Sequence, residues 1–143
     1  MIRYLVDTNV VSEMRKKKPH GGALGWLQSL DVEQVFFSAV TFGEIQKGVE
    51  LTRRQDAVKA QEIEAWAGQL ERSAQVLAMD AGCFREYARL MHRRSQTLAE
   101  DAMIAATARV HGLTVATRNE RDFGHFDVAV FNPFRADRSH RKG

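Results

Sequence analysis

Short apolar runs alternate with longer amphipathic segments along almost the whole chain. The apolar runs predict strands at 2–6, 34–38, 75–78, 113–117 and 127–131. Between them, apolar residues at three- and four-residue spacing predict helices over about 9–16, 22–30, 40–53, 56–72, 80–95 and 98–111. Strands that alternate with helices in this way indicate an α/β fold with a parallel central sheet.

The size of the chain and its few breaks predict one domain. The sequence has 143 residues and only two prolines, neither of which lies in a stretch that resembles a domain boundary. No internal repeat or low-complexity linker interrupts it. We therefore expect a single domain over residues 1–134, followed by a basic tail at 135–143 that is flexible.

Composition indicates a globular protein of the cytoplasm. The hydrophobic fraction is 44% and the charged fraction is 27%, both ordinary for a soluble domain. No apolar run approaches the roughly 20 residues that span a bilayer, and the first apolar run is too short for a signal peptide. The single cysteine, Cys83, excludes an internal disulfide and is expected to be a buried, structural thiol.

Positive charge is unevenly distributed although the net charge is only +3. Basic residues cluster at 15–18, at 93–94 and in the final segment, RADRSHRKG. Such clusters contact phosphates in nucleic-acid-binding proteins, but they also occur as solvated surface runs. Charge alone leaves both interpretations open.

Carboxylates and amides collect where the predicted strands end and the following helices begin. Ligands of open α/β sheets bind outside the carboxyl ends of the strands, so this edge is where a site is expected. The residues concerned are Asp7, Glu44, Asp101, Asn119 and Asp122.

Each of these acids also has a purely structural interpretation. Asp7 is a suitable N-cap for the helix that begins near residue 9. Glu44 stands three residues after Thr41, and Glu100 three residues after Thr97, which are the spacings of a capping box. Asp101 would favour the start of a helix through the helix dipole.

Helical geometry indicates that Asp101 and Glu44 do more than cap helices. Asp101 shares a helix face with Ile104, Ala105 and Ala108, which is the face expected to point inwards. Glu44 shares a face with Gly48, a glycine that weakens the helix and leaves room beside the acid. Acids that face one another inside a protein repel unless a cation lies between them.

Oxygen ligands without a cysteine or histidine cluster suit Mg²⁺ or Mn²⁺ better than Zn²⁺. No nucleotide-binding glycine loop, zinc-protease motif or serine-nucleophile motif is present. The chemistry indicated is metal-assisted phosphoryl transfer, in which bound ions activate water and neutralise the charge that develops on phosphate.

Five segments carry a resemblance to a known family. LVDTNVVSE, AVTFGEIQKGVE, EDAMIAATA, VATRNERDF and FNPF occur in this order, and together they resemble the PIN-domain ribonucleases. Within that family the chain is similar to the VapC-type toxins of prokaryotic toxin–antitoxin pairs, from about residue 2 to 134. The resemblance implies a three-layer α/β/α PIN-like fold with a central, mainly parallel sheet. It also implies Mg²⁺- or Mn²⁺-dependent cleavage of single-stranded RNA.

The resemblance also assigns roles to the acids. Asp7 and Asp101 match the main metal ligands, and Glu44 matches a ligand that acts directly or through water and positions the nucleophilic water. The fourth acidic position of the family falls nearest Asn119, where many relatives carry an aspartate. Asn119 and Asp122 are therefore expected to be weaker, outer ligands.

Other positions would support this site. Thr117 matches a family hydroxyl that would hydrogen-bond a ligating acid or a phosphate, and Thr8 and Asn9 would shape the turn at Asp7. The basic residues 15–18 follow the first helix and would meet the RNA backbone.

The partners implied are an RNA substrate, a second copy of the chain in a homodimer, and a small VapB-like antitoxin. The antitoxin would cover the acidic cleft, with an arginine among the acids, and would supply DNA binding. Two alternatives remain: a PIN-like RNA-binding protein that has lost catalysis, and a housekeeping RNA-processing nuclease. A phosphatase with an aspartyl nucleophile is disfavoured, because Asn9 stands where its second acid would be.

Overall fold

A five-stranded sheet forms the centre of the computed structural model, which describes residues 1–135. Its strands are β1 (Tyr4–Val6), β2 (Val35–Ser38), β3 (Val76–Leu77), β4 (Thr114–Ala116) and β5 (Val130–Phe131). They lie in the order β3-β2-β1-β4-β5, and each neighbouring pair is parallel. The predicted α/β class is confirmed, and in the described part of the chain the sheet is wholly parallel.

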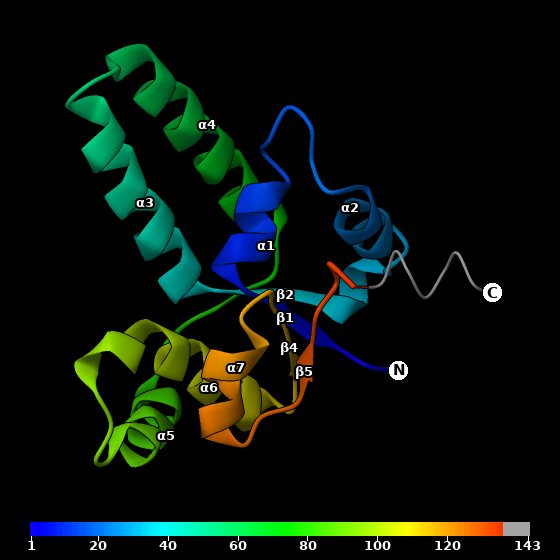
Figure 1. The fold of residues 1–143 in the computed structure, drawn as a ribbon, viewed down its shortest axis with the longest axis vertical. Coiled ribbons are helices and arrows are strands. Elements are labelled where there is room, and N and C mark those ends of the chain that lie inside the picture. Colours follow the sequence, from blue (N-terminus) through cyan, green and yellow to red (C-terminus); the bar gives the residue numbers. More distant parts are fainter. Residues whose placement is uncertain (136–143) are drawn as a thin grey trace.

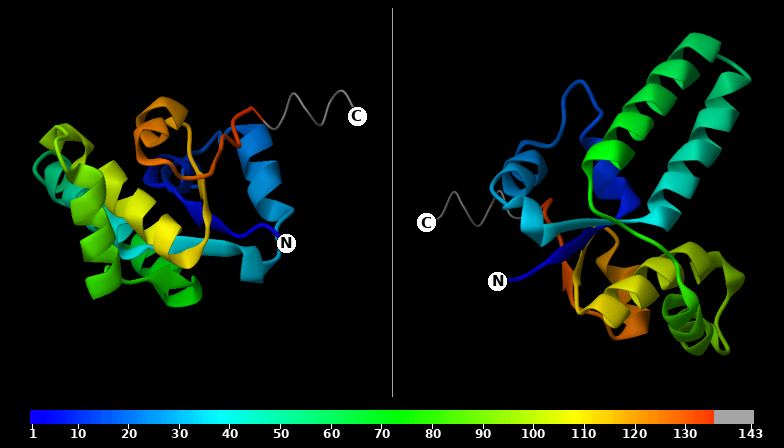
Figure 2. Two further views of the ribbon diagram at one scale, coloured as in Figure 1. Left: turned by 90° about the horizontal axis from the view of Figure 1, so that it is seen from below. Right: turned by 180° about the vertical axis from the view of Figure 1, so that it is seen from behind.

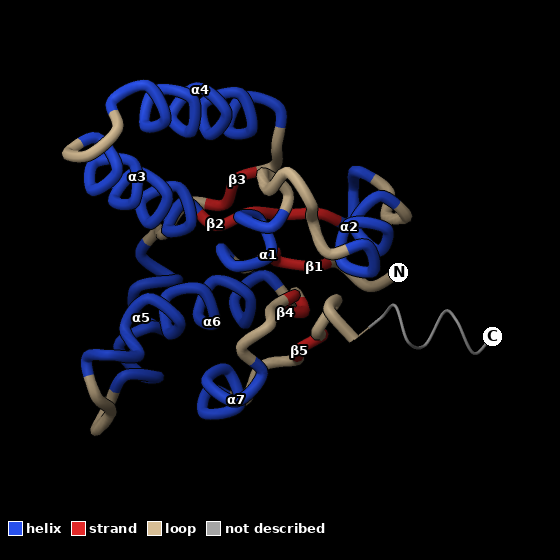
Figure 3. The backbone as a smooth tube through the Cα atoms, turned by 45° about the horizontal axis from the view of Figure 1, so that its top comes forward, coloured by secondary structure: helices blue, strands red, loops and turns tan. Residues whose placement is uncertain are grey.

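Helices cover both faces of this sheet (Figures 1 and 3). The α-helices are α1 (Thr8–Glu13), α2 (Gly21–Gln28), α3 (Ala39–Arg53), α4 (Ala57–Ser73), α5 (Ala81–Met91), α6 (Ala99–His111) and α7 (Glu120–Phe123). Short 3-10 helices occupy Val32–Gln34, Gln96–Leu98 and Gly124–Phe126. The first four α-helices lie on one face and the last three on the other, which confirms the expected three layers. The α3–α4 hairpin projects beyond the sheet (Figure 2).

The central strand shows why the layers form on both faces. Leu5 and Val6 are adjacent in β1 and fully buried, and their side chains point to opposite faces because strand side chains alternate. Leu5 packs with residues of α6 and α7, including Ile104 and Phe123. Val6 packs with residues of α1, α3 and α4. A strand buried on both faces reads as a continuous apolar run, as this one does.

Several predicted element boundaries were wrong. The helix predicted to reach residue 95 ends at Met91, because Arg93 takes a left-handed conformation with φ of 64° that a helix cannot continue through. The first helix ends at Glu13 rather than at 16. The last strand is shortened to Val130–Phe131, since Asp127 is also left-handed, with φ of 49°. Helix α7 was not predicted, and its four residues are too few to show a periodicity.

Two other expectations can be compared with the structure. Cys83 is fully buried, as expected for a structural thiol, and burial raises the pKa of that thiol. Within residues 1–135, none of the helices has both the length and the apolar character needed to cross a membrane. The predicted basic tail, apart from Arg135, lies outside the described residues.

Candidate functional site at the carboxyl edge of the sheet

The centre of the site lies where the chain changes direction across the sheet. The chain runs outwards from β1 to β2 and β3, and it later adds β4 and β5 on the other side of β1. Asp7 follows β1 and Thr117 follows β4, so both stand at this switch point, the usual position of a ligand site in open α/β sheets. The Thr117 hydroxyl donates a hydrogen bond of 2.7 Å to Asp7 Oδ2.

Asp7 is buried yet well supplied with hydrogen bonds. Its side chain is the N-cap of α1, with Oδ1 accepting from the backbone N–H of Thr8 at 2.8 Å. Its Oδ2 also accepts from Asn9 Nδ2 at 3.1 Å. Burial raises the pKa of Asp7, although the hydrogen bonds from Thr117, Thr8 and Asn9 oppose this effect. The same Asp7 carboxylate therefore caps α1 and stands at the end of the strand. Thr8 and Asn9 hydrogen-bond to it and shape the turn, as expected.

Glu44 reaches the same region from α3. Thr8 Oγ1 donates to Glu44 Oε1 at 2.9 Å, which links the acid to the turn that holds Asp7. Burial first, and then the neighbouring Glu100 carboxylate, raise the pKa of Glu44 to about 8. The capping-box interpretation of Glu44 was wrong, because Ser38 is the N-cap of α3 and accepts from the backbone of Val40.

Asp101 comes from the first turn of α6 on the other face of the sheet. Its helix-face neighbours Ile104, Ala105 and Ala108 are all fully buried, so the predicted inward face is confirmed. Burial, and then the charges of Asp7 and Asp122, raise the pKa of Asp101 to about 6. Acids from β1, α3 and α6 thus act on one another electrostatically.

The two residues expected to be outer ligands differ in placement. Asn119 is exposed, and its side chain makes no hydrogen bond within the described residues; its backbone N–H donates to Thr117 Oγ1 at 2.9 Å. Asp122 is half-buried on α7, and its charge contributes to the raised pKa of Asp101. The structure therefore brings the charge of Asp122 close to Asp101, while Asn119 is linked to Asp7 through the Thr117 hydroxyl.

Glu100 is a member of the acidic cluster that the sequence did not single out. Its capping-box interpretation was wrong, since Thr97 belongs to a 3-10 helix whose N-cap is Ser95, and α6 begins after Leu98 without a side-chain cap. Glu100 lies close enough to Glu44 to raise the pKa of that residue. Its position directly before Asp101 was the signal that could have revealed it.

A groove of about 210 Å³ opens beside Glu44, between α1 and the α3–α4 hairpin. Its lining residues are Thr8, Ser12, Arg15, Glu44, Ile45, Gly48, Thr52, Ile63 and Trp66. A Cβ atom added at Gly48 would have no atom within 4 Å apart from its chain neighbours and the backbone of its own helix, so close packing does not explain this glycine. The expected space beside Glu44 is present.

The chemistry of the acids fits a hard divalent cation. The donors are carboxylate oxygens, the type that Mg²⁺ and Mn²⁺ prefer. A cation among them would offset the burial and the mutual repulsion that raise the pKa values of Glu44 and Asp101. Within residues 1–135, however, no three acidic, histidine or cysteine side chains are already gathered closely enough to hold a metal ion. Binding an ion therefore requires these side chains to move towards one another.

Comparison with known proteins gives a consistent family. The family model described as the PIN domain matches residues 4–129. Toxin FitB of Neisseria gonorrhoeae is 36% identical over 137 residues, which cover 91% of this chain and 97% of the relative. VapC ribonuclease Y4jK of Sinorhizobium fredii is 32% identical over 142 residues, covering 91% and 96% of the two chains.

A solved structure agrees with this result. The structure of FitAB bound to an IR36 DNA fragment contains a chain that superposes with a TM-score of 0.77 and 35% sequence identity. The match covers 92% of this chain and 95% of the other. Sequence and fold therefore point to the same group of relatives.

Proposed function

Because this chain belongs to the PIN-domain family and is related within it to VapC-type toxins, we propose that it is a metal-dependent endoribonuclease of a type II toxin–antitoxin pair. The observation that carries the proposal is that Asp7, Glu44 and Asp101 lie at one edge of the sheet, where the charge of Asp7 acts on both other acids. The neighbours that raise the pKa values of Glu44 and Asp101 are other carboxylates, an arrangement that favours binding of a cation.

Asp7 and Asp101 would hold the ion, with Glu44 as a third ligand, directly or through water. Asp122 and Asn119 would act from further out. When bound, a divalent ion lowers the pKa of water and neutralises charge on the phosphate. Thr117, Thr8 and Asn9 keep the Asp7 carboxylate in place through the hydrogen bonds described above. Glu44, held by the Thr8 hydroxyl, orients the attacking water.

The reaction would be hydrolysis of single-stranded RNA. Water adds to the phosphorus of a phosphodiester, one P–O bond breaks, and the leaving oxygen takes up a proton. We expect the purified full-length chain to cleave labelled single-stranded RNA with Mg²⁺ or Mn²⁺ and to lose this activity in EDTA. Cleavage that continues unchanged in EDTA would contradict the proposed mechanism.

The raised pKa values predict an unusual pH dependence of stability. In the folded chain Glu44 holds its proton up to about pH 8 and Asp101 up to about pH 6, whereas the unfolded chain releases these protons near pH 4 to 4.5. The folded state therefore binds more protons in this range, and stability falls as pH rises from about 5 to about 8. Thermal unfolding of the metal-free chain should show a midpoint that decreases with pH.

Two comparisons isolate this effect. Adding Mg²⁺ or Mn²⁺ should restore the midpoint at pH 8, because the ion compensates the ionised acids. Glu44→Gln should flatten the decrease between pH 6 and 8. Acids with a lowered pKa, such as Glu86 beside Arg109, change stability only below about pH 4.5 and do not mask it. A midpoint that rises with pH in wild type would show that folding does not raise the pKa values of Glu44 and Asp101.

The proposed partners are a homodimeric second copy and a small VapB-like antitoxin, in the cytoplasm where RNA and antitoxin are made. An antitoxin segment that carries an arginine would suit the groove beside Glu44, because the arginine would pair with this carboxylate at the edge of the acidic site. In this scheme the antitoxin supplies the DNA-binding element.

One observation favours a second candidate function. The exposed amide of Asn119 replaces the acid that many relatives carry, so a PIN-like protein that binds RNA without cutting it would fit this position. Asp122 stands close enough to Asp101 to supply the missing charge, which is why we favour the enzyme. A housekeeping nuclease would differ only in its substrate and in the lack of an antitoxin.

A further inference from the structure

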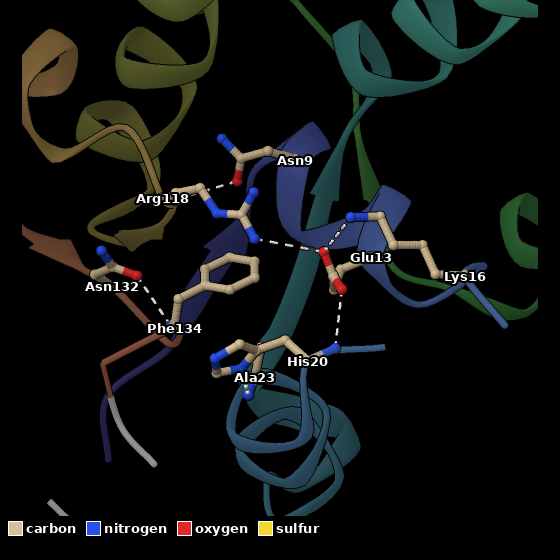
Figure 4. A network of polar contacts seen from close by, with 8 residues as sticks. All are labelled: Asn9, Glu13, Lys16, His20, Ala23, Arg118, Asn132 and Phe134. Atoms are coloured by element: carbon tan, nitrogen blue, oxygen red, sulfur yellow. Dashed lines mark hydrogen bonds and ion pairs between the residues drawn. The ribbon is translucent and has the colours of Figure 1, made fainter. Parts of the chain in front are cut away.

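A second polar cluster lies beside the acidic site, at the C-terminal end of α1 (Figure 4). We call it the Glu13 cluster, and its members are Glu13, Lys16, His20, Arg118 and Phe134. The Glu13 side chain is only 7% exposed. Its Oε1 accepts from Lys16 Nζ at 2.9 Å and lies 3.5 Å from Arg118 Nη2, while Oε2 accepts from the backbone N–H of His20 at 2.8 Å.

The Arg118 guanidinium is held in a fixed orientation but still has N–H donors without a protein partner among residues 1–135. Its guanidinium carbon lies 3.8 Å from the centre of the Phe134 ring, a cation–π contact that sets the plane of the group. Within residues 1–135 the only side-chain hydrogen-bond partner of the guanidinium is Glu13, at the long distance of 3.5 Å. The Arg118 side chain is 51% exposed, so its guanidinium is accessible to a ligand.

The cluster has an excess of one positive charge. Glu13 stays ionised, since the hydrogen bond from Lys16 is the main cause that lowers its pKa. One carboxylate therefore gathers two cations, Lys16 and Arg118, and the Lys16 side chain is 56% exposed. The charge left over matches the single negative charge of a backbone phosphate in a nucleic-acid strand.

The Glu13 cluster is connected to the acidic site. Arg118 directly follows Thr117, the residue whose hydroxyl binds Asp7. The backbone N–H of Arg118 donates to Asn9 Oδ1 at 3.2 Å, and Asn9 Nδ2 donates in turn to Asp7 Oδ2 at 3.1 Å. Glu13 lies six residues after Asp7, which corresponds to about 9 Å along the helix axis. The cluster is therefore within reach of an RNA strand bound at the acidic site.

We propose that Lys16 and Arg118, gathered by the buried Glu13, bind a backbone phosphate of the RNA strand beside the phosphate that is cleaved. This proposal rests on the proposed ribonuclease function. It also refines the expectation for the basic run at 15–18. Of that run, Lys16 contacts Glu13, whereas no ion pair joins Lys17 or Lys18 to a residue in the described part of the chain.

The test is binding of the full chain to a fluorescein-labelled, mixed-sequence single-stranded RNA, measured by anisotropy in EDTA so that metal and cleavage play no part. Arg118→Ala and Lys16→Ala should each raise Kd by about tenfold. Each should also make the slope of log affinity against log salt shallower by about 0.7, the value for one lost phosphate contact on a single strand. Lys17→Ala, which removes the same charge one residue away, should change Kd by less than about twofold.

Arg118→Lys separates orientation from charge. It keeps the charge but loses the planar group on Phe134, so its Kd should lie between those of wild type and Arg118→Ala. In Mg²⁺, Arg118→Ala should raise KM for cleavage more than it lowers kcat, which a general loss of structure would not do. Thermal unfolding checks that each variant is folded.

Equal Kd values for Arg118→Ala, Lys16→Ala and Lys17→Ala would overturn the phosphate site even if the wild type cleaves RNA. Conversely, a wild type that never cleaves RNA, but binds it through Lys16 and Arg118, would support the phosphate site and contradict the nuclease. A wild type that neither binds nor cleaves RNA would overturn both.

Discussion

Asp101→Asn is expected to abolish RNA cleavage while leaving the fold intact. The substitution removes one of the two main proposed ligands, so the loss should exceed the 10- to 100-fold that is typical when only a group supporting a ligand is lost. Cleavage rates for wild type and variant are compared on one labelled RNA with saturating Mg²⁺ or Mn²⁺.

The same substitution should not weaken the fold. Asp101 is half-buried and has a pKa of about 6, so above that pH its ionised form opposes folding. The neutral amide removes this repulsion, and the thermal midpoint of the metal-free variant at pH 8 should equal or exceed that of wild type. Activity would then be lost without a loss of stability, as expected for a site whose ionised acids oppose folding.

Asp127→Asn is the matched control. The change from carboxylate to amide is the same, but Asp127 is fully exposed, and an asparagine tolerates its left-handed backbone. Cleavage by this variant should match wild type. If Asp101→Asn retained wild-type activity, Asp101 would be a helix-start acid without a catalytic role, and the proposed site would be wrong.

Phe123→Ala should produce the largest loss of stability. Phe123 is fully buried in the core cluster with Leu5, Ile104, Val115 and Phe126. Removing a buried phenyl ring typically costs about 3–5 kcal/mol, because it leaves a cavity that the core fills only partly. Urea unfolding at pH 6 would measure this loss as a lower midpoint with an unchanged slope.

Phe84→Ala supplies the control for this experiment. Its side chain is the same, but it is 49% exposed on the outer side of α5. We expect a cost of less than about 1 kcal/mol. If both phenylalanine variants lost the same stability, α7 would not be anchored by its aromatic side chain, and the turn at 117–119 would need another support.

Local sequence patterns were sufficient to predict the fold class. Apolar runs such as Tyr4–Val6 and the periodic face of α6 are properties of a few neighbouring residues, so alternating strands and helices could be predicted without knowledge of contacts. The acids Asp7, Glu44 and Asp101 could be proposed as a site because parallel strands bring their carboxyl ends to one edge. The order of the family segments pointed to the same three residues.

Other features depended on which segments become neighbours. The strand order β3-β2-β1-β4-β5 places Thr117 against Asp7, although 110 residues separate them in sequence. The contact between Glu13 and Arg118, 105 residues apart, arises in the same way. The periodicity of apolar residues shows which face of a segment is buried. It does not show which other segment covers that face, so it carries no information about such pairs.

Glu100 shows the same limit at short range. By spacing alone Glu100 fitted a capping box with Thr97. Nothing in the neighbouring sequence indicated a different partner for its side chain. In the folded chain Ser95 caps the preceding 3-10 helix, and Glu100 instead approaches Glu44. The sequence by itself thus determined the elements and the acids that they carry. Packing of the helices against the sheet decided which acids meet, because only the folded chain fixes distances between residues that are remote in sequence.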